Sequence, residues 1–410
     1  MTAKILFLTQ IVPYPPDAGP KVKTWHVLRA LAKQGHDVTL ISFVRPEELQ
    51  YLSVLRELCT AVQTVPIKRS RVVDIGYLIS SYLKRRPFLI ERDDLKAMQQ
   101  LVQNLVQSQS FDFIHADQLT MVQFAVRSVT TSLGARPKVI FDAHNAVWTI
   151  VKRMRDTAPW FLKPVLSIEA NRVKAYEGYL LRTVDTVLAV TEMDRTGLEE
   201  ALAHTNASND LAKAPITVIP IAVDTSELQP ISRTLDTPNI LTLGTLHYPP
   251  NADGIRWFVQ DVYPIIQREN HDVTLTIVGK NPPRDFLEFA ARYPQHIKVT
   301  GYAPDLRTYL RQSTLMVIPV RSGGGMRVRI LEAFAYGMPV VTTSIGLEGI
   351  DAVPGQDVLV ADTASQFADH VIELLRDTSL QEKLSQNGRR LAETRYDWQF
   401  VLSALKTIYE

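Results

Sequence analysis

The segment from Leu315 to Val341, LMVIPVRSGGGMRVRILEAFAYGMPVV, restricts the possible folds of this chain more than any other part of it. An apolar run leads into three consecutive glycines, residues 323–325, and a helical pattern begins directly after them. Glycine has no Cβ, so this loop can turn sharply and bring its backbone N–H groups close to an anion at the helix N-terminus. Gly337 and Pro339 end the helix. The segment therefore predicts a strand, an anion-binding loop, a helix and a second strand.

The charged residues after the glycines allow two interpretations. Arg327 and Arg329 would add positive charge beside a bound anion, and Glu332 lies further along the same predicted helix. Arg329 and Glu332 are three residues apart, however, and could simply pair across the helix surface. The glycines themselves could form a plain turn, because glycine clusters are common in loops that bind nothing.

The pattern GGGMRVRILEAFAYGMPVV resembles the donor-site segment of family-4 glycosyltransferases, which have the GT-B fold. The resemblance implies that Glu332 binds the ribose hydroxyls of a nucleotide-sugar, and that Arg327 and the glycine N–H groups hold its diphosphate. Family members commonly have a second Glu at the position of Gly324, and many have an Arg and a Lys in the segment matching Leu243–Asn251, which contains neither here. The predicted donor-binding residues are Gly19, Gly244, Arg321, Gly323, Gly324, Gly325, Met326, Arg327, Arg329 and Glu332.

The first half of the chain alternates between strand and helix patterns. Strands are predicted at Lys4–Leu8 and Val38–Phe43, with helical spacing over Val22–Gln34 between them, and further strands near Phe113, at 139–142 and at 184–190. This alternation is typical of a parallel sheet covered by helices on both faces. Gly19 opens the first helix, where it either lets the backbone approach the donor or forms an ordinary turn.

A second series of strand and helix patterns begins near Asn239, which fits the two domains expected for 410 residues. We predict an N-terminal domain at 1–216, a linker at 217–233 and a C-terminal domain at 234–395. The resemblance implies that the last helix, within 396–410, packs back on the first domain. It also implies a GT-B fold, in which two Rossmann-like doubly wound domains face a central cleft.

Two groups of polar residues follow strand patterns in the first domain. His115 and Asp117 lie in FDFIHADQ, and Asp142, His144 and Asn145 lie in VIFDAHN. Ligands of open α/β sheets bind beyond the carboxyl ends of the strands, so these side chains are expected near the site. We predict His115, Asp117 and His144 as catalytic residues. The alternative is that each His is a hydrogen-bonded structural residue.

Composition excludes several other functions. The formal net charge is only +2, which gives no reason to expect a nucleic-acid partner, and the single cysteine cannot form an internal disulfide. No apolar stretch is long enough to cross a bilayer. We therefore expect a cytoplasmic protein. Neither group of polar residues has metal-ligand spacing and no Asp-x-Asp is present, so no metal or other cofactor is expected.

The segment Lys68–Arg92 interleaves basic residues with apolar and aromatic ones. One interpretation is that it forms the rim of an acceptor site and contacts an anionic membrane surface or a lipid phosphate, at the inner face of the membrane. The other is that it is a solvated basic helix face.

The sequence thus favours a retaining, metal-independent hexosyltransferase that moves a sugar from a UDP- or GDP-sugar to a glycan or lipid-linked acceptor in cell-surface polysaccharide biosynthesis. Two alternatives stay open. One is a sugar-nucleotide epimerase or hydrolase on the same fold. The other is a degenerate scaffold that binds nucleotide-sugar without turnover, which Gly324 and Asp117 suggest because relatives often have Glu and His at those positions.

Overall fold

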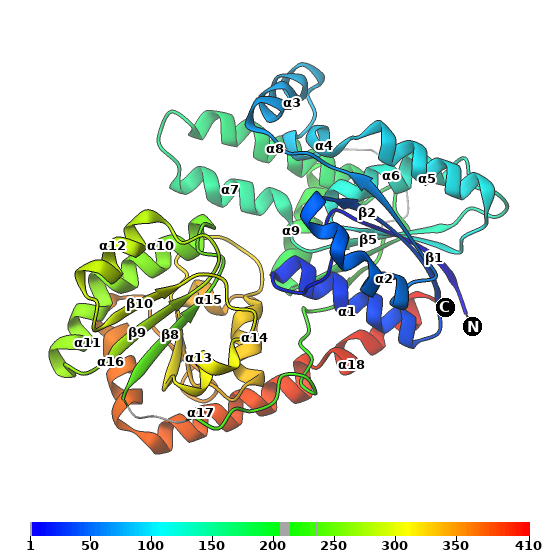
Figure 1. The fold of residues 1–410 in the computed structure, drawn as a ribbon. Helices are drawn as coiled ribbons and strands as arrows, with labels where there is room; N and C mark the ends of the chain where they lie inside the picture. The colour runs from blue at the N-terminus through cyan, green and yellow to red at the C-terminus, as the bar shows by residue number, and fades with distance from the viewer. Residues whose placement is uncertain (1, 206–213, 234–236) are drawn as a thin grey trace. The chain divides into compact units, whose positions relative to one another are not determined.

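The computed structural model describes residues 2–205, 214–233 and 237–410, which form two compact units (Figure 1). Unit 1 contains the chain up to Ile221 together with Val401–Glu410, and unit 2 contains Ala222–Phe400. Each unit is a parallel sheet with helices on both of its faces. The chain therefore has the two α/β domains that the alternating patterns predict.

The sheet of unit 1 has seven parallel strands in the order β3-β2-β1-β4-β5-β6-β7. Its central strands are almost completely buried because both faces are covered, and their sequences are correspondingly apolar. The order reverses direction beside β1, which places β1 and β4 at a topological switch point. The strands are β1 (Lys4–Thr9), β2 (Asp37–Val44), β3 (Ala61–Pro66), β4 (Phe113–Asp117), β5 (Lys138–Ala143), β6 (Thr186–Ala189) and β7 (Ile216–Val218).

The helices of unit 1 connect these strands and form its outer layers. They are α1 (Gly19–Lys33), α2 (Leu52–Leu58), α3 (Arg71–Lys84), α4 (Phe88–Asp93), α5 (Lys96–Ser108), α6 (Leu119–Val129), α7 (Val147–Thr157), α8 (Lys163–Leu180) and α9 (Glu192–His204), with a 3-10 turn at Pro46–Tyr51. A buried glutamate from α8 caps α7, since Glu177 accepts hydrogen bonds from the N–H groups of Val147 (2.7 Å) and Trp148 (3.1 Å). Burial raises the pKa of Glu177 to about 8.

Unit 2 contains six parallel strands in the order β10-β9-β8-β11-β12-β13. They are β8 (Asn239–Leu243), β9 (Thr274–Val278), β10 (Ile297–Thr300), β11 (Leu315–Ile318), β12 (Val340–Thr342) and β13 (Leu359–Val360). Its helices are α10 (Pro249–Trp257), α11 (Tyr263–Glu269), α12 (Arg284–Arg292), α13 (Arg307–Arg311), α14 (Val328–Ala335), α15 (Ser344–Leu347), α16 (Ala364–Arg376), α17 (Thr378–Leu391) and α18 (Trp398–Val401), with π-helical turns at Phe258–Val262 and Ala392–Tyr396.

The unit boundaries differ from the predicted domain limits at two places. Strand β7 overlaps the start of the predicted linker at 217–233, and the division between the units falls between Ile221 and Ala222. The single helix expected near the C-terminus is broken into α18, a 3-10 turn at Leu402–Ala404 and α19 (Leu405–Ile408). Only the residues from Val401 onward belong to unit 1.

No helix in the described part of the chain combines the length and the apolar character needed to span a membrane.

Candidate functional site

The glycine loop follows β11 and adopts backbone conformations that glycine favours. Gly323 has a φ of +95° and Gly325 a φ of +83°, both in the left-handed region that other residues rarely occupy. A Cβ added at Gly323 would also lie 3.4 Å from Cγ of Pro250. Both positions therefore favour glycine because of their backbone conformation.

Arg327 stabilises this loop directly. Helix α14 begins at Val328, so Arg327 lies just before its first residue instead of on its surface. Its guanidinium donates hydrogen bonds from Nη1 to the carbonyl oxygens of Gly324 (2.5 Å) and Gly325 (2.6 Å). The positive charge predicted for the loop is thus present, and it also holds the loop in its shape.

Arg329 and Glu332 form the ion pair that the sequence allowed as an alternative. Nη1 of Arg329 lies 2.6 Å from a carboxylate oxygen of Glu332, and the two side chains are 30% and 17% exposed. A carboxylate has about four acceptor positions, so one such contact does not prevent Glu332 from accepting hydrogen bonds from a ligand.

Close backbone packing supports the loop from neighbouring elements. A Cβ on Gly254 of α10 would overlap the carbonyl oxygen of Pro319, directly after β11, and one on Gly279 would overlap that of Gly244, directly after β8. Two further predicted donor residues of unit 2 flank the loop. Arg321 stacks over Trp257, 5.2 Å from the ring centroid, and Met326 is buried.

In unit 1, Asp117 ends β4 and is completely buried. One of its carboxylate oxygens accepts hydrogen bonds from the hydroxyls of Thr9 (2.8 Å) and Thr24 (2.9 Å). The other lies 2.7 Å from Nε2 of His144. Asp117 therefore orients the His144 ring, which is 9% exposed, whereas His115 and Asp117 have no exposed surface.

His115 belongs to a second buried chain of contacts. Its Nδ1 lies 2.5 Å from the hydroxyl of Tyr409, and its Nε2 lies 3.4 Å from Asp142. Asp142 is also bound by the ammonium group of Lys23 on α1. Burial alone would raise the pKa of Asp142, but the charge of Lys23 and the contact with His115 hold it well below its usual value. Asp142 is thus ionised, and the ammonium group of Lys23 balances its charge.

The backbone around these strand ends shows where the fold is strained. Gln118 directly follows Asp117 and has a φ of +73° and a ψ of 157°, a region almost restricted to glycine. Its N–H donates to the carbonyl oxygen of Asp142. Gly19 is the first residue of α1 and has no positive φ, so its backbone conformation does not itself require glycine. The strained backbone of Gln118, directly after β4, is of the kind often found at functional sites.

His115, Asp117 and Asp142 also have the composition of a metal site. One atom from each lies within 4.8 Å of the others, and all three residues are buried. Lys23 already neutralises Asp142, and two hydroxyls and an imidazole already satisfy Asp117. A cation bound here would have to compete with the ammonium group of Lys23 for Asp142 and with three hydrogen-bond partners for Asp117, so the cluster fits a metal poorly.

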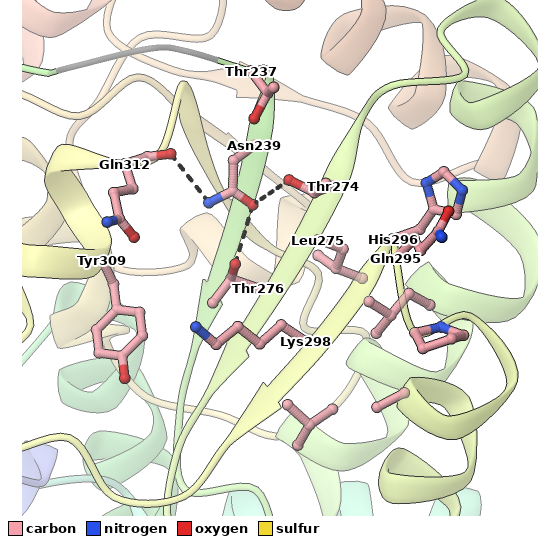
Figure 2. Close-up of a pocket in the computed structure, with 14 residues that line it drawn as sticks. Thr237, Asn239, Thr274, Leu275, Thr276, Gln295, His296, Lys298, Tyr309 and Gln312 are labelled. Atoms are coloured by element: carbon pink, nitrogen blue, oxygen red, sulfur yellow. Dashed lines mark hydrogen bonds between the residues drawn. The ribbon is translucent and has the colours of Figure 1, made fainter.

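A cavity of about 570 Å³ lies at the opposite end of the unit 2 sheet, where β8, β9 and β10 begin (Figure 2). Its lining is mainly polar. Asn239 fixes two of the lining hydroxyls, because its side-chain oxygen accepts hydrogen bonds from Thr274 (3.0 Å) and Thr276 (3.1 Å). None of the predicted donor-binding residues lines this cavity, so it is separate from the glycine loop.

Sequence reasoning missed several residues that build these sites. Lys23, Thr9 and Thr24 complete the buried network of unit 1, and Tyr409 reaches it from the far end of the chain. Gly254 carried a usable signal, since an unexplained glycine within a helix often marks close packing. Lys23 and Thr24 carried none, because a single Lys or Thr in a helical pattern usually faces solvent.

The two parallel-sheet units place the chain in the GT-B class of folds. Residues 19–227 match a family model described as Glycosyltransferase Family 4, and residues 237–377 match one described as Glycosyl transferases group 1. The first match spans more than half of the chain. The chain therefore belongs to the family-4 glycosyltransferases, as its donor-site segment predicted.

Individual relatives are distant but similar over much of their length. A Klebsiella pneumoniae protein described as an uncharacterized 44.6 kDa protein in the cps region is 22% identical over 98% of this chain and 99% of its own. The Staphylococcus aureus capsular polysaccharide biosynthesis glycosyltransferase CapM is 22% identical over 60% of this chain and 68% of its own. The structure of Anabaena Alr3699/HepE with UDP and glucose has a TM-score of 0.66, 14% identity and 99% coverage of both chains.

Proposed function

We propose that this glycosyltransferase moves a hexose from a UDP- or GDP-sugar to a hydroxyl of a glycan or lipid-linked acceptor, with retention of anomeric configuration, during polysaccharide assembly. One observation carries the proposal. The loop of Gly323–Gly325, shaped by two positive φ angles, leads into α14, and that helix carries Glu332. A relative whose structure contains UDP and glucose, and another described as a capsular polysaccharide glycosyltransferase, support the choice of donor and pathway.

On the donor side, the loop N–H groups and the N-terminus of α14 would face the diphosphate, and Glu332 would accept hydrogen bonds from the ribose hydroxyls. Arg327 and Arg329 would stabilise the negative charge that develops on the leaving nucleoside diphosphate. Removing one electrostatic contact of this kind typically costs about 10²-fold or more in rate. Gly324 leaves the usual glutamate position without a side chain, so recognition of the donor sugar would depend on other residues.

On the acceptor side, we assign substrate contact to His144. Of the predicted trio His115, Asp117 and His144, only His144 has any exposed surface, at 9%, and Asp117 fixes its ring through Nε2. Both ring nitrogens of His115 already face protein partners, at Tyr409 and Asp142. His115 and Asp117 therefore act as positioning residues in this proposal.

We propose that transfer needs no divalent metal. Support comes from Lys23, whose ammonium group already neutralises Asp142, and from Thr9 and Thr24, which bind one carboxylate oxygen of Asp117 in the same cluster. The arginines of the donor loop would supply the charge that a metal provides in other transferases. An activity that EDTA abolishes and Mg²⁺ or Mn²⁺ restores would contradict this.

We also propose that the protein works in the cytoplasm, at the inner face of the membrane, because a lipid-linked acceptor would be presented there. The segment Lys68–Arg92, predicted from its basic and aromatic residues to contact anionic lipid, includes all of α3.

The decisive experiment is a product analysis with each UDP- and GDP-sugar, with and without acceptor and EDTA, on wild type and Glu332→Gln. We expect a new glycoside that forms only with acceptor, in the donor's anomeric configuration by ¹H NMR, and less of it from the variant. Glu288→Gln on α12 is a control, because Glu288 also pairs with an arginine on its own helix. Sugar release or epimerisation without acceptor would indicate the hydrolase or epimerase. Nucleotide binding without any product would indicate a scaffold.

A further inference from the structure

Helix α3 exposes the apolar side chains that a helix normally buries. Val72, Ile75, Ile79 and Leu83 are spaced three, four and four residues apart, so they form one stripe along the helix. All four are exposed, Val72 by 79% and Leu83 by 80%. The stripe faces away from the core of unit 1, and folding of the chain does not account for it.

A second exposed apolar group lies between α7 and α8. Trp160 and Phe161, in the turn that joins these helices, are 82% and 59% exposed, and the exposure continues onto the first turns of α8 at Val165 and Ile168. Soluble proteins expose single apolar residues routinely, but a contiguous group marks a surface that binds something. Of the 23 large apolar side chains exposed in the described residues, 14 lie on α3, α7, α8 and this turn.

The two groups belong to one part of unit 1, because α3 and α4 contact α8 directly. The guanidinium of Arg172 on α8 stacks over the ring of Tyr82 on α3, 4.5 Å from its centroid. The N–H of Phe88, at the start of α4, donates to Glu169 of α8 (2.6 Å). Ile168 lies one turn before Arg172 along the same helix. Figure 1 shows α3 beside α8 at one end of the unit. We call the exposed apolar side chains of α3 and of residues 154–168 the docking face.

Positive charge surrounds the docking face. Residues 68–94 contain seven basic and four acidic residues, and three of these acidic residues, Glu91, Asp93 and Asp94, pair with Arg69, Lys84 and Arg86. Residues 147–176 contain six basic and two acidic residues, so both segments keep a net positive formal charge. The formal net charge of the whole chain is only +2, so its excess of positive charge is concentrated at these two segments. Amphipathic helices with aromatic and aliphatic residues flanked by Lys and Arg bind the surface of anionic bilayers. A second copy of the chain is a worse partner, because the same basic residues would meet across a two-fold interface.

We propose that the docking face binds an anionic lipid bilayer, with Trp160, Phe161 and the stripe of α3 inserted at the boundary between headgroups and acyl chains. Trp and Phe are suited to this boundary because their large rings gain most from leaving water. The surface has two anchors, a helix and an aromatic turn, and the basic residues around them contact lipid headgroups. The proposal rests on the proposed function only in that a lipid-linked acceptor would be found in the same bilayer.

The test is sedimentation of the full chain with phosphatidylglycerol–phosphatidylcholine vesicles and with pure phosphatidylcholine vesicles. Wild type is expected to bind the anionic vesicles and to lose binding as salt rises, because salt screens the headgroup charge. The double variant Trp160→Ser/Phe161→Ser should bind them at least about tenfold more weakly, since it removes two large apolar side chains from the contact.

A matched control is Leu49→Ser/Leu133→Ser, which removes two apolar side chains of unit 1 that are 54% and 52% exposed and lie outside the docking face. It should bind as wild type does. Equal binding of wild type to both kinds of vesicle, no binding to either, or unchanged binding by the docking-face variant would overturn the proposal. The proposal would also be overturned if wild type formed a dimer in solution and Trp160→Ser/Phe161→Ser dissociated it. Turnover with a soluble acceptor should be the same in all these variants, so a failure here is distinguishable from a failure of the proposed transferase activity.

Discussion

Replacing Glu332 by glutamine is expected to weaken nucleotide binding strongly and to change stability very little. The structural role of the carboxylate is one contact, the 2.6 Å ion pair with Arg329 three residues earlier on the same helix surface. Pairs of this type contribute about 0.2–0.5 kcal/mol to a helix, and solvent screens them when they are partly exposed. Glutamine has nearly the same shape, so α14 should keep its packing.

The expected loss of binding is larger. A hydrogen bond to a charged group contributes about 1.5–3 kcal/mol, against about 0.5–1.5 kcal/mol for a neutral one. If the carboxylate accepts two hydrogen bonds from ribose, its neutralisation should cost about 2–3 kcal/mol. That corresponds to a Kd raised roughly 30- to 150-fold.

Isothermal titration with UDP and GDP measures this binding, and thermal unfolding without ligand measures stability. The variant should unfold within about 1 °C of wild type, because so small a free-energy change moves the Tm little in a chain of this length. Glu288→Gln should affect neither measurement, since Glu288 pairs with Arg284 on α12 and lies on no element of the proposed donor site. A Kd within about threefold of wild type would refute the assignment of Glu332 to the ribose.

Three further substitutions test the packing and buried groups. Gly254→Ala should destabilise unit 2 by roughly 2–4 kcal/mol in denaturant unfolding, because its Cβ would overlap the backbone of Pro319; a neutral result would contradict the close approach of α10 to β11. Tyr409→Phe should cost about 1–3 kcal/mol, since it leaves Nδ1 of buried His115 without its partner; wild-type stability would argue against that contact. The raised pKa of Glu177, about 8 when folded and 4.5 when unfolded, adds stability that is complete below pH 4.5 and lost as pH rises to about 8, by at most about 5 kcal/mol. Glu177→Gln should flatten this part of the stability profile, and an unchanged slope would refute the pKa assignment.

The sequence was informative where a pattern repeats along one element. The apolar runs of β1, β2 and β5 were predicted to within a residue at each end, because strands buried on both faces are largely apolar. Strand β3 (Ala61–Pro66) was missed, since it lies at the edge of the sheet and most of its side chains are only partly buried. Strands β7 and β13, of three and two residues, are too short to show a recognisable strand pattern in the sequence.

The candidate site was predicted unevenly for the same reason. The glycine loop is local in sequence, so its position before a helix was predicted correctly, although Arg327 was placed on the helix and proves to bind the loop carbonyls. The buried network of unit 1 is not local. Asp117 and Asp142 were found by their places after strands, but Lys23 lies on α1, and Tyr409 lies 294 residues from the His115 that it contacts. Nothing in the sequence joins residues so far apart.

The return of the chain to unit 1 at Val401 has a consequence for biosynthesis. A ribosome makes the seven strands of unit 1 first and all of unit 2 next, and only then the ten residues, Val401–Glu410, that complete unit 1. Until Tyr409 emerges, the hydroxyl that contacts His115 is missing and Phe113 lacks the aromatic ring that packs 5.0 Å from it. Unit 1 therefore lacks its last ten residues during the whole synthesis of unit 2. In nascent chains stalled within unit 2, a protease should cut unit 1 more easily than it does in the finished protein.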